Sequence, residues 1–200
     1  MNAKQRRQSA IIDQVFKSPV FETERLIVGN WDPDLDSLAW SIYGDPRVVR
    51  YLKGTPEPTV ESTREMIKQL IRRNQLWPSH FGSWPTFLKT TRELIGANLM
   101  KFLPDADGQF TPDVEIGWHL GRDFWGRGYA TEGAHAMVRI AFEQIGLKTL
   151  WAVTKTENLA SQRVAKRIGM SHRGQTGRYY NQQLELFRLR VSESRYSGHL

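Results

Sequence analysis

The sequence contains no cysteine among its 200 residues, which excludes disulfide frameworks, thiolate metal sites and a cysteine nucleophile. It also lacks an apolar run long enough to cross a bilayer. The stretch 1–17, MNAKQRRQSAIIDQVFK, lacks the apolar core of a secretory signal. We therefore expect a cytoplasmic protein with no membrane partner.

Internal repeats, low-complexity tracts and Gly/Ser linkers are absent as well, so no composition boundary divides the chain. Hydrophobic residues make up 40% and charged residues 24%, which is close to the average of soluble globular chains. Two hundred residues is the size of one ordinary domain. We predict a flexible polar arm over residues 1–17 and a single folded domain over residues 18–200.

Positive charge is in excess, because 28 Lys and Arg face 21 Asp and Glu and leave the chain at +7. This excess favours an anionic partner. The basic residues form scattered pairs instead of a stripe, so we expect no nucleic-acid partner. A polyanionic small cofactor would satisfy the charge equally well.

Periods of two and of nearly four alternate along the chain and predict strands and helices in turn. Strand-like runs occupy 22–31, 83–91, 93–103, 114–120, 149–154 and 183–191. Helical patterns occupy 32–45, 59–75, 130–145 and 158–168, and Gly146 is placed to cap the third of them. We predict loops at 105–113 and at 76–85, where two prolines, a glycine and three aromatics disfavour a regular element. The order indicates an α/β (α+β) fold with mostly antiparallel hairpins and one strand, helix, strand crossover.

A glycine-rich stretch, GRDFWGRGYATEG at 121–133, lies between a predicted strand and a predicted helix. Bare backbone N–H groups and the positive end of a helix together form an anion site. A P-loop does not fit, because Arg127 and Gly128 stand where its Lys and hydroxyl belong. A dinucleotide fingerprint does not fit either, because Thr131 replaces its third glycine and the next strand ends without an acidic residue.

The run from Glu115 to Met170 resembles the acetyl-CoA core of the GNAT N-acetyltransferases, most closely the Rim-type branch that acetylates ribosomal-protein N-termini. Within it FWGRGYATEG resembles the pyrophosphate loop and TENLASQRVAKRIGM the cofactor-side helix, and the earlier FETERLIV resembles the first strand. The chain departs from the family at Trp125, where Gln or Arg usually begins the loop, and at Ala165, where many members carry a tyrosine general acid.

The resemblance implies a GNAT fold, in which a mixed, mostly antiparallel twisted sheet is flanked by helices. Its fourth and fifth strands, here 114–120 and 149–154, splay apart for acetyl-CoA. It further implies an acetyl-CoA-dependent N-acetyltransferase that needs no metal. The implied cofactor-binding residues are Trp118, His119, Leu120, Trp125, Gly126, Arg127, Gly128, Tyr129, Ala130, Thr131 and Asn158.

Candidate catalytic groups follow from the same resemblance. Glu115 shares a strand face with Gly117 and His119 and is the candidate general base, with a solvated or ion-paired glutamate as the alternative. His119 is the competing base. Ser161 would protonate the leaving sulfur, although a serine at a helix start also serves the backbone. Asn158 is expected to cap that helix, to bind the pantetheine, or both.

The resemblance places the acceptor groove at five side chains. For the aromatic ones, the alternative is a buried position in the core. They are Trp31, Trp84, Tyr179, Tyr180 and Glu185. The first acceptor hypothesis is a protein or peptide N-terminus, and the second is a small amine or aminated antibiotic. A non-catalytic acyl-CoA-binding domain is a third reading of different class. The sequence leaves a homodimer open.

Overall fold

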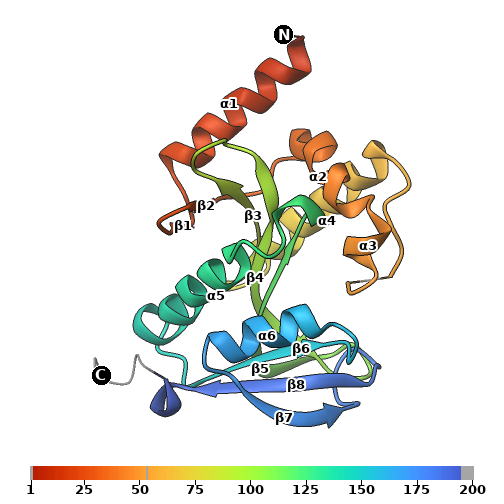
Figure 1. Cartoon of the computed structure of the whole chain (residues 1–200). Coiled ribbons are helices and arrows are strands. Elements are labelled where there is room, and N and C mark those ends of the chain that lie inside the picture. Colours follow the sequence, from red (N-terminus) through yellow and green to blue (C-terminus); the bar gives the residue numbers. More distant parts are fainter. Residues whose placement is uncertain (1, 53, 195–200) are drawn as a thin grey trace. The chain divides into compact units, whose positions relative to one another are not determined.

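The computed structural model describes residues 2–52 and 54–194. The chain divides into two compact units, one of residues 1–98 and 119–129 and the other of residues 99–118 and 130–200 (Figure 1). Each unit is therefore described by itself. No helix in the described ranges has the length and apolar character that crossing a membrane requires.

Eight strands join one mixed sheet in the order β1-β2-β3-β4-β5-β6-β8-β7. Antiparallel pairs link β1 to β2, β2 to β3, β6 to β8 and β7 to β8, whereas β5 and β6 run parallel across the predicted crossover. The expected mixed, mostly antiparallel architecture is confirmed. The strands are β1 (Phe21–Glu22), β2 (Leu26–Val28), β3 (Gly82–Leu88), β4 (Leu94–Pro104), β5 (Phe110–Leu120), β6 (Thr149–Thr154), β7 (Ser171–Thr176) and β8 (Leu184–Arg190).

The helices confirm the four predicted helical segments and add two more. They are α1 (Ala3–Lys17), α2 (Asp36–Tyr43), α3 (Pro46–Val49), α4 (Val60–Gln75), α5 (Tyr129–Arg139) and α6 (Leu159–Arg167). Short 3₁₀ turns are η1 (Pro33–Leu35), η2 (Arg122–Phe124) and η4 (Val191–Glu193), and a π-helical turn, η3 (Ile140–Gln144), continues α5.

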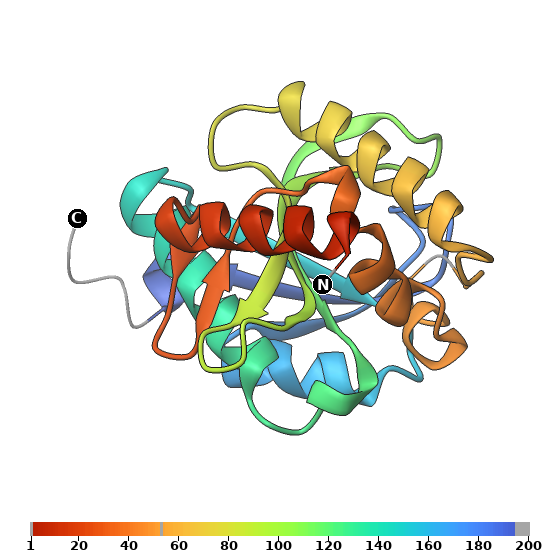
Figure 2. The ribbon, with the colours of Figure 1, turned by 90° about the horizontal axis from the view of Figure 1, so that it is seen from above.

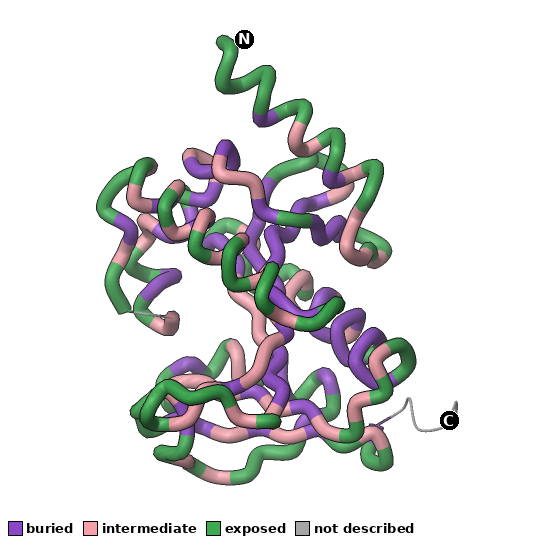
Figure 3. Tube along the Cα trace, turned by 180° about the vertical axis from the view of Figure 1, so that it is seen from behind, coloured by how far each residue is buried: buried purple, intermediate pink, exposed green. Residues whose placement is uncertain are grey.

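The segment predicted as a flexible arm is helical in the structure. Asn2 and Gln5 form a reciprocal capping box that begins α1. The helix packs against η1 and β2 (Figure 2) and buries Val15 in the core of the first unit. Most of its remaining surface is exposed (Figure 3). Polar residues dominate the sequence of this segment, and its helical structure depends on a short apolar face that meets the core.

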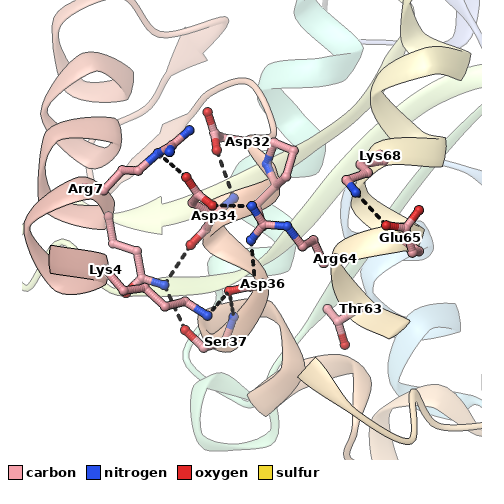
Figure 4. Close-up of polar contacts among 12 residues, drawn as sticks. Lys4, Arg7, Asp32, Asp34, Asp36, Ser37, Thr63, Arg64, Glu65 and Lys68 are labelled. Carbon is pink, nitrogen blue, oxygen red and sulfur yellow. Dashed lines mark hydrogen bonds and ion pairs between the residues drawn. The ribbon is translucent and has the colours of Figure 1, made fainter. Parts of the chain in front are cut away.

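A cluster of ion pairs holds α1 and α4 to the turn that leads into α2 (Figure 4). Arg64 of α4 lies 2.5 Å from Asp34 Oδ1 and 3.0 Å from Asp36 Oδ2. From α1, Arg7 pairs with Asp34, and Lys4 Nζ lies 2.8 Å from Asp36. Both aspartates are buried, so the cations compensate their desolvation.

The second unit confirms the predicted apolar stripe of α5. Its central positions are fully buried: Ala134, Met137, Val138, Ala141 and Phe142. The helix then widens into η3, and Gly146 closes it with the expected left-handed φ of 78°. The next helix, α6, packs against β6 and β7.

The strands differ from the sequence prediction in four places. The predicted strand 22–31 is divided into β1 and β2, which pair with each other antiparallel. The edge strand β7 was missed because SHRGQT is polar and exposed, and it contains a bulge with Gly174 at φ 86°. β5 begins at Phe110, inside the predicted loop 105–113. β3 begins at Gly82, inside the predicted loop 76–85. Pro85 cannot donate a hydrogen bond, but the strand accommodates it because its carbonyl oxygen accepts from Gly29 N–H at 3.1 Å.

Candidate functional site

The glycine loop after β5 lies in the first unit and uses left-handed backbone twice. Gly126 has φ 75° and Gly128 has φ 83°. A Cβ added at Gly126 would meet no atom within 4 Å, so this glycine is required by its backbone conformation. Gly121, in contrast, has an ordinary φ of −57°. Residues 125–128 are all exposed, which leaves their backbone open to a ligand.

Trp125 fastens the start of this loop to the end of β5. Its indole N–H donates to the Leu120 carbonyl oxygen at 2.8 Å, while 45% of the residue stays exposed. The aromatic that departs from the family pattern therefore has a defined structural role, and it occupies the Leu120 carbonyl.

Arg25 is the residue of this loop region that the sequence analysis missed. Its Nη1 donates to the Arg127 carbonyl oxygen at 3.1 Å, and its guanidinium lies 4.6 Å from the centre of the Tyr129 ring. A Cβ placed on Gly128 would lie 3.4 Å from Arg25 Nη2. The sequence offered one signal for this contact. Arg25 belongs to the run FETERLIV, which resembles the first strand of the family, and the start of this strand lies against the loop.

The donors gathered here suit a pyrophosphate. Arg25 supplies a guanidinium group beside the backbone of Arg127, the two glycines supply exposed amides, and α5 begins directly afterwards at Tyr129. Ala130 and Thr131 form the first turn of that helix and are half-buried. The residues present therefore fit the phosphate end of coenzyme A.

His119 lies in the first unit and is paired with Tyr43. Its Nε2 lies 2.8 Å from the Tyr43 hydroxyl, and the two rings meet edge to face at 5.3 Å. Burial lowers the pKa of His119 to about 4 and raises that of Tyr43. The imidazole is therefore neutral at pH 7, and one of its nitrogens is occupied. A Cβ on Gly96 would stand 2.1 Å from the His119 carbonyl oxygen, so β4 approaches this residue as only a glycine allows.

Glu115 lies in the second unit on β5, and 7% of it is exposed. The Tyr180 hydroxyl donates to Glu115 Oε2 at 2.5 Å, and Lys101 Nζ lies 3.6 Å from the same oxygen. The Lys101 ammonium also lies 5.0 Å from the centre of the Tyr180 ring. Two residues predicted separately, one as base and one as acceptor contact, are thus brought together.

The turn between β7 and β8 presents Tyr180 through strained backbone. Tyr180 and Asn181 have φ of 57° and 51°, in the left-handed region that such side chains seldom adopt. The neighbouring Tyr179 is 1% exposed and donates to Asp113 Oδ2 at 2.7 Å. Consecutive tyrosines therefore bind two alternate carboxylates of β5, and the ring of Tyr179 belongs to the core.

β5 and β6 pair in parallel at Glu115 opposite Trp151. In the described strands this is the one position of the second unit at which the two share a register, so Ile116 and Gly117 continue β5 without a partner on β6. Such diverging parallel strands leave backbone groups available to a ligand. Trp118 follows, and its indole nitrogen is buried with no hydrogen-bond partner in the described part of the chain.

Asn158 caps α6, as one of the two expected roles requires. Its Oδ1 accepts from Ser161 N–H at 3.2 Å, and its Nδ2 donates to Ser161 Oγ at 3.2 Å. Ser161 Oγ acts as the acceptor in this contact, which leaves its own hydrogen to donate. The two residues predicted for cofactor and acid roles are thus a single capped helix start in the second unit.

Glu185 is held in an internal network of the second unit. Its oxygens accept from Gln175 at 2.9 Å and Thr156 at 2.9 Å, and lie 2.6 Å from His172 Nε2. These hydrogen bonds, Gln175 first, lower the pKa of the carboxyl group. The network engages both carboxylate oxygens of a residue predicted to contact the acceptor.

Trp31 and Trp84, the remaining predicted acceptor residues, are both 6% exposed and line one cavity of the first unit. The cavity measures about 540 Å³. The structure therefore brings these two rings together in one wall.

Comparison with known proteins gives one family. The model of an acetyltransferase (GNAT) domain matches residues 25–171. The uncharacterized N-acetyltransferase p20 of Bacillus licheniformis is 27% identical over 152 residues, which are 76% of this chain and 82% of that protein. The FsC-acetyl coenzyme A-N(2)-transacetylase of Aspergillus fumigatus is 38% identical over 95 residues, but these are 46% of this chain and 40% of that protein.

A solved structure resembles the whole fold at low identity. The RimL ribosomal L7/L12 alpha-N-protein acetyltransferase in complex with coenzyme A matches with a TM-score of 0.65 and 16% identity. The match covers 88% of this chain and 98% of that one.

Proposed function

The chain belongs to the GNAT family of N-acetyltransferases, which transfer an acetyl group to amines, and from this premise we propose that it acetylates a primary amine with acetyl-CoA. The observation that carries the proposal is the loop at residues 125–129. Its two left-handed glycines and the guanidinium of Arg25 make an anion cradle at the end of β5. The predicted compartment is the cytoplasm.

We assign the cofactor contacts residue by residue, by resemblance to the family. Arg25, Arg127 and the amides of Gly126 and Gly128 hold the pyrophosphate. The backbone of residues 118–120 holds the pantetheine, with a backbone N–H as donor to the developing oxyanion. Asn158 adds a side-chain contact. When bound, acetyl-CoA supplies a thioester whose acetyl carbon accepts the electron pair of the amine.

Glu115 is the proposed general base, acting directly or through one water. Tyr180 and Lys101 fix its carboxylate from one side, and burial removes competing solvent. His119 is the weaker candidate because Tyr43 engages its Nε2. As the amine nitrogen bonds to the acetyl carbon and the carbon–sulfur bond breaks, Glu115 takes the amine proton. Ser161, whose hydrogen is available, gives a proton to the departing sulfur and regains one from water.

The proposed acceptor is the N-terminal amine of a protein or peptide, by resemblance to the Rim branch. A small amine or aminated antibiotic is the second candidate. Turnover of a panel of peptides and small amines chooses between these classes. A chain that bound acetyl-CoA yet turned over none of the panel would instead be the non-catalytic binding domain.

Calorimetric titration with acetyl-CoA tests the cofactor assignment. We expect binding at micromolar concentration, weakened about tenfold in Arg25→Gln because a charge-assisted contact to phosphate is lost. Arg92→Gln is the matched control, since Arg92 also covers an aromatic ring, that of Phe16 at 4.3 Å, and also lies in the first unit. Equal affinities for the two variants would contradict the assignment of Arg25, and no binding by the unaltered chain would contradict the proposed function.

A further inference from the structure

The cavity of the first unit is a small-molecule site by size and lining. Its volume of about 540 Å³ is within the range of ligand pockets in proteins. Four aromatic side chains line it: Trp31, Trp77, Phe81 and Trp84. Rings in this number favour a ligand that is itself planar and apolar, because stacked or edge-on rings add to the effect of area burial.

The lining of the cavity carries no acidic, lysine or arginine side chain among the residues that the structure describes there. Its polar groups include the amides of Asn30, Asn74 and Gln75. Asn74 is engaged at both ends with the backbone of Ser83, at 2.9 and 3.0 Å, and so supports the wall. An ionic ligand would lose its hydration here without gaining a counter-ion, so the cavity favours a neutral group.

One polar atom of the cavity wall requires a partner. Trp31 is 6% exposed, and its buried indole N–H has no acceptor within the described ranges of the chain. A buried donor left unpaired destabilises a protein, so a ligand that offers an acceptor is favoured here. A carbonyl oxygen on the ligand would satisfy it. The adjacent His80 holds a left-handed φ of 69°, which is strained for a residue with a side chain.

Trp31 also connects the cavity to the end of β5. Its ring lies 6.3 Å from the ring of Tyr43, and the Tyr43 hydroxyl lies 2.8 Å from His119 Nε2. All three residues belong to the first unit. Two successive ring contacts therefore link the wall of the cavity to the strand end to which we assigned the pantetheine.

We propose that this cavity holds a neutral aromatic group of the amine acceptor, whose adjacent carbonyl oxygen accepts from the Trp31 indole. The inference rests on the proposed function and names its substrate class. A peptide or amino-acid amide that begins with an aromatic residue carries an amine, a ring and a carbonyl oxygen together. Aliphatic amines would leave the cavity unfilled and the indole unpaired.

Indole N–H signals in ¹⁵N-labelled protein test the site without any turnover. N-Acetyl-L-phenylalaninamide is the probe, and N-acetyl-L-alaninamide is the same molecule without the ring. We expect the phenyl probe to move the signal that Trp31→Phe removes, and the alanine probe to leave it in place. Trp31→Phe should weaken the phenyl probe about fivefold, as the loss of one hydrogen bond predicts.

Trp40→Phe is the matched control, because the Trp40 indole N–H already donates to the Glu57 carbonyl oxygen at 3.1 Å and Trp40 does not line the cavity. It should bind the probe as the unaltered chain does. If Trp31→Phe does not fold, turnover by the unaltered chain decides, with at least tenfold higher kcat/KM expected for phenylalaninamide than for alaninamide.

Two further outcomes separate this inference from the proposed function. If acetyl-CoA binds but both amides turn over equally, or if no indole signal responds selectively to the ring, the cavity proposal is overturned while the acetyltransferase stands. If the phenyl probe binds but acetyl-CoA does not, the acceptor assignment is overturned together with the proposed function.

Discussion

The Tyr180 hydroxyl donates to Glu115 Oε2 at 2.5 Å and ties the turn between β7 and β8 to β5. The sequence-based prediction treats the two residues independently, Glu115 as the base and Tyr180 as an acceptor contact. Their pairing makes Tyr180 a positioning residue for the proposed base.

Tyr180→Phe should lower kcat about tenfold and leave the KM for acetyl-CoA unchanged. The reason is that the Glu115 carboxylate loses the donor that holds it in position, and hydrogen bonds to charged groups contribute about 1.5–3 kcal/mol. Steady-state rates at varied acetyl-CoA concentration provide the measurement.

Tyr179→Phe is the matched control for that variant. It removes the same kind of bond, from the Tyr179 hydroxyl to Asp113 Oδ2 at 2.7 Å, at the next residue along the chain. It should reduce stability by about 1 kcal/mol and leave kcat unchanged. Equal kcat values for the two variants would reduce Tyr180 to a structural role.

Gly126→Ala should impair acetyl-CoA binding beyond its effect on stability. Gly126 and Gly108 both have left-handed φ, 75° and 83°, and at both a Cβ would meet nothing within 4 Å. Each alanine variant should therefore destabilise the fold by about 1–2 kcal/mol. The KM for acetyl-CoA should rise about tenfold or more in Gly126→Ala alone, because there the new methyl group stands where we propose that the phosphates bind. An equal rise of this KM in Gly108→Ala would contradict the assignment of the loop to the cofactor site.

Acid should destabilise the chain partly through His119. Its pKa is about 4 when folded and 6.5 when exposed, so between these values the unfolded chain binds more protons. The stability due to the buried neutral ring is complete above pH 6.5 and is lost as the pH falls toward 4. His119→Gln should flatten this part of the curve of unfolding free energy against pH by about 1–3 kcal/mol.

His80→Gln is the comparison for that experiment, since His80 is exposed. It should retain the steep acid limb of the unaltered chain in urea titrations. A His119→Gln curve as steep as that of the unaltered chain would contradict the burial of a neutral imidazole.

Arg64→Met should destabilise the first unit strongly, by about 3 kcal/mol, because it leaves the buried Asp34 and Asp36 undercompensated. Lys68→Met changes a second cation of the same helix, whose partner Glu65 is exposed (Figure 4). That loss should stay within about 0.5 kcal/mol. Urea midpoints give both values, and equal effects would show that the cluster does not hold α1 and α4.

Features with a local cause could be predicted from the sequence. The apolar stripe of α5 and the left-handed Gly146 follow from period and cap chemistry, and both were found. The glycine loop could be predicted because its left-handed backbone requires glycines at positions that are close together in the sequence. The polar strand β7 and the helix α1 were not, because pairing with β8 and docking on the core form them rather than an intrinsic pattern.

The partners of the candidate site depended on contacts distant in sequence. His119 meets Tyr43 across 76 positions, and Glu115 meets Tyr180 across 65. Arg25 reaches Arg127 across 102 positions. No periodicity encodes such pairs, so residue types suggested the chemistry while the fold determined which groups meet.

The most direct test of acetyl transfer is mass spectrometry of an amine acceptor incubated with acetyl-CoA and the protein, with coenzyme A release followed in the same reaction. We expect one added acetyl group on phenylalaninamide for each coenzyme A released, and a much slower reaction with Glu115→Gln, as the proposed function requires. Release of coenzyme A without an acetylated amine, or no release with any member of the acceptor panel, would contradict it.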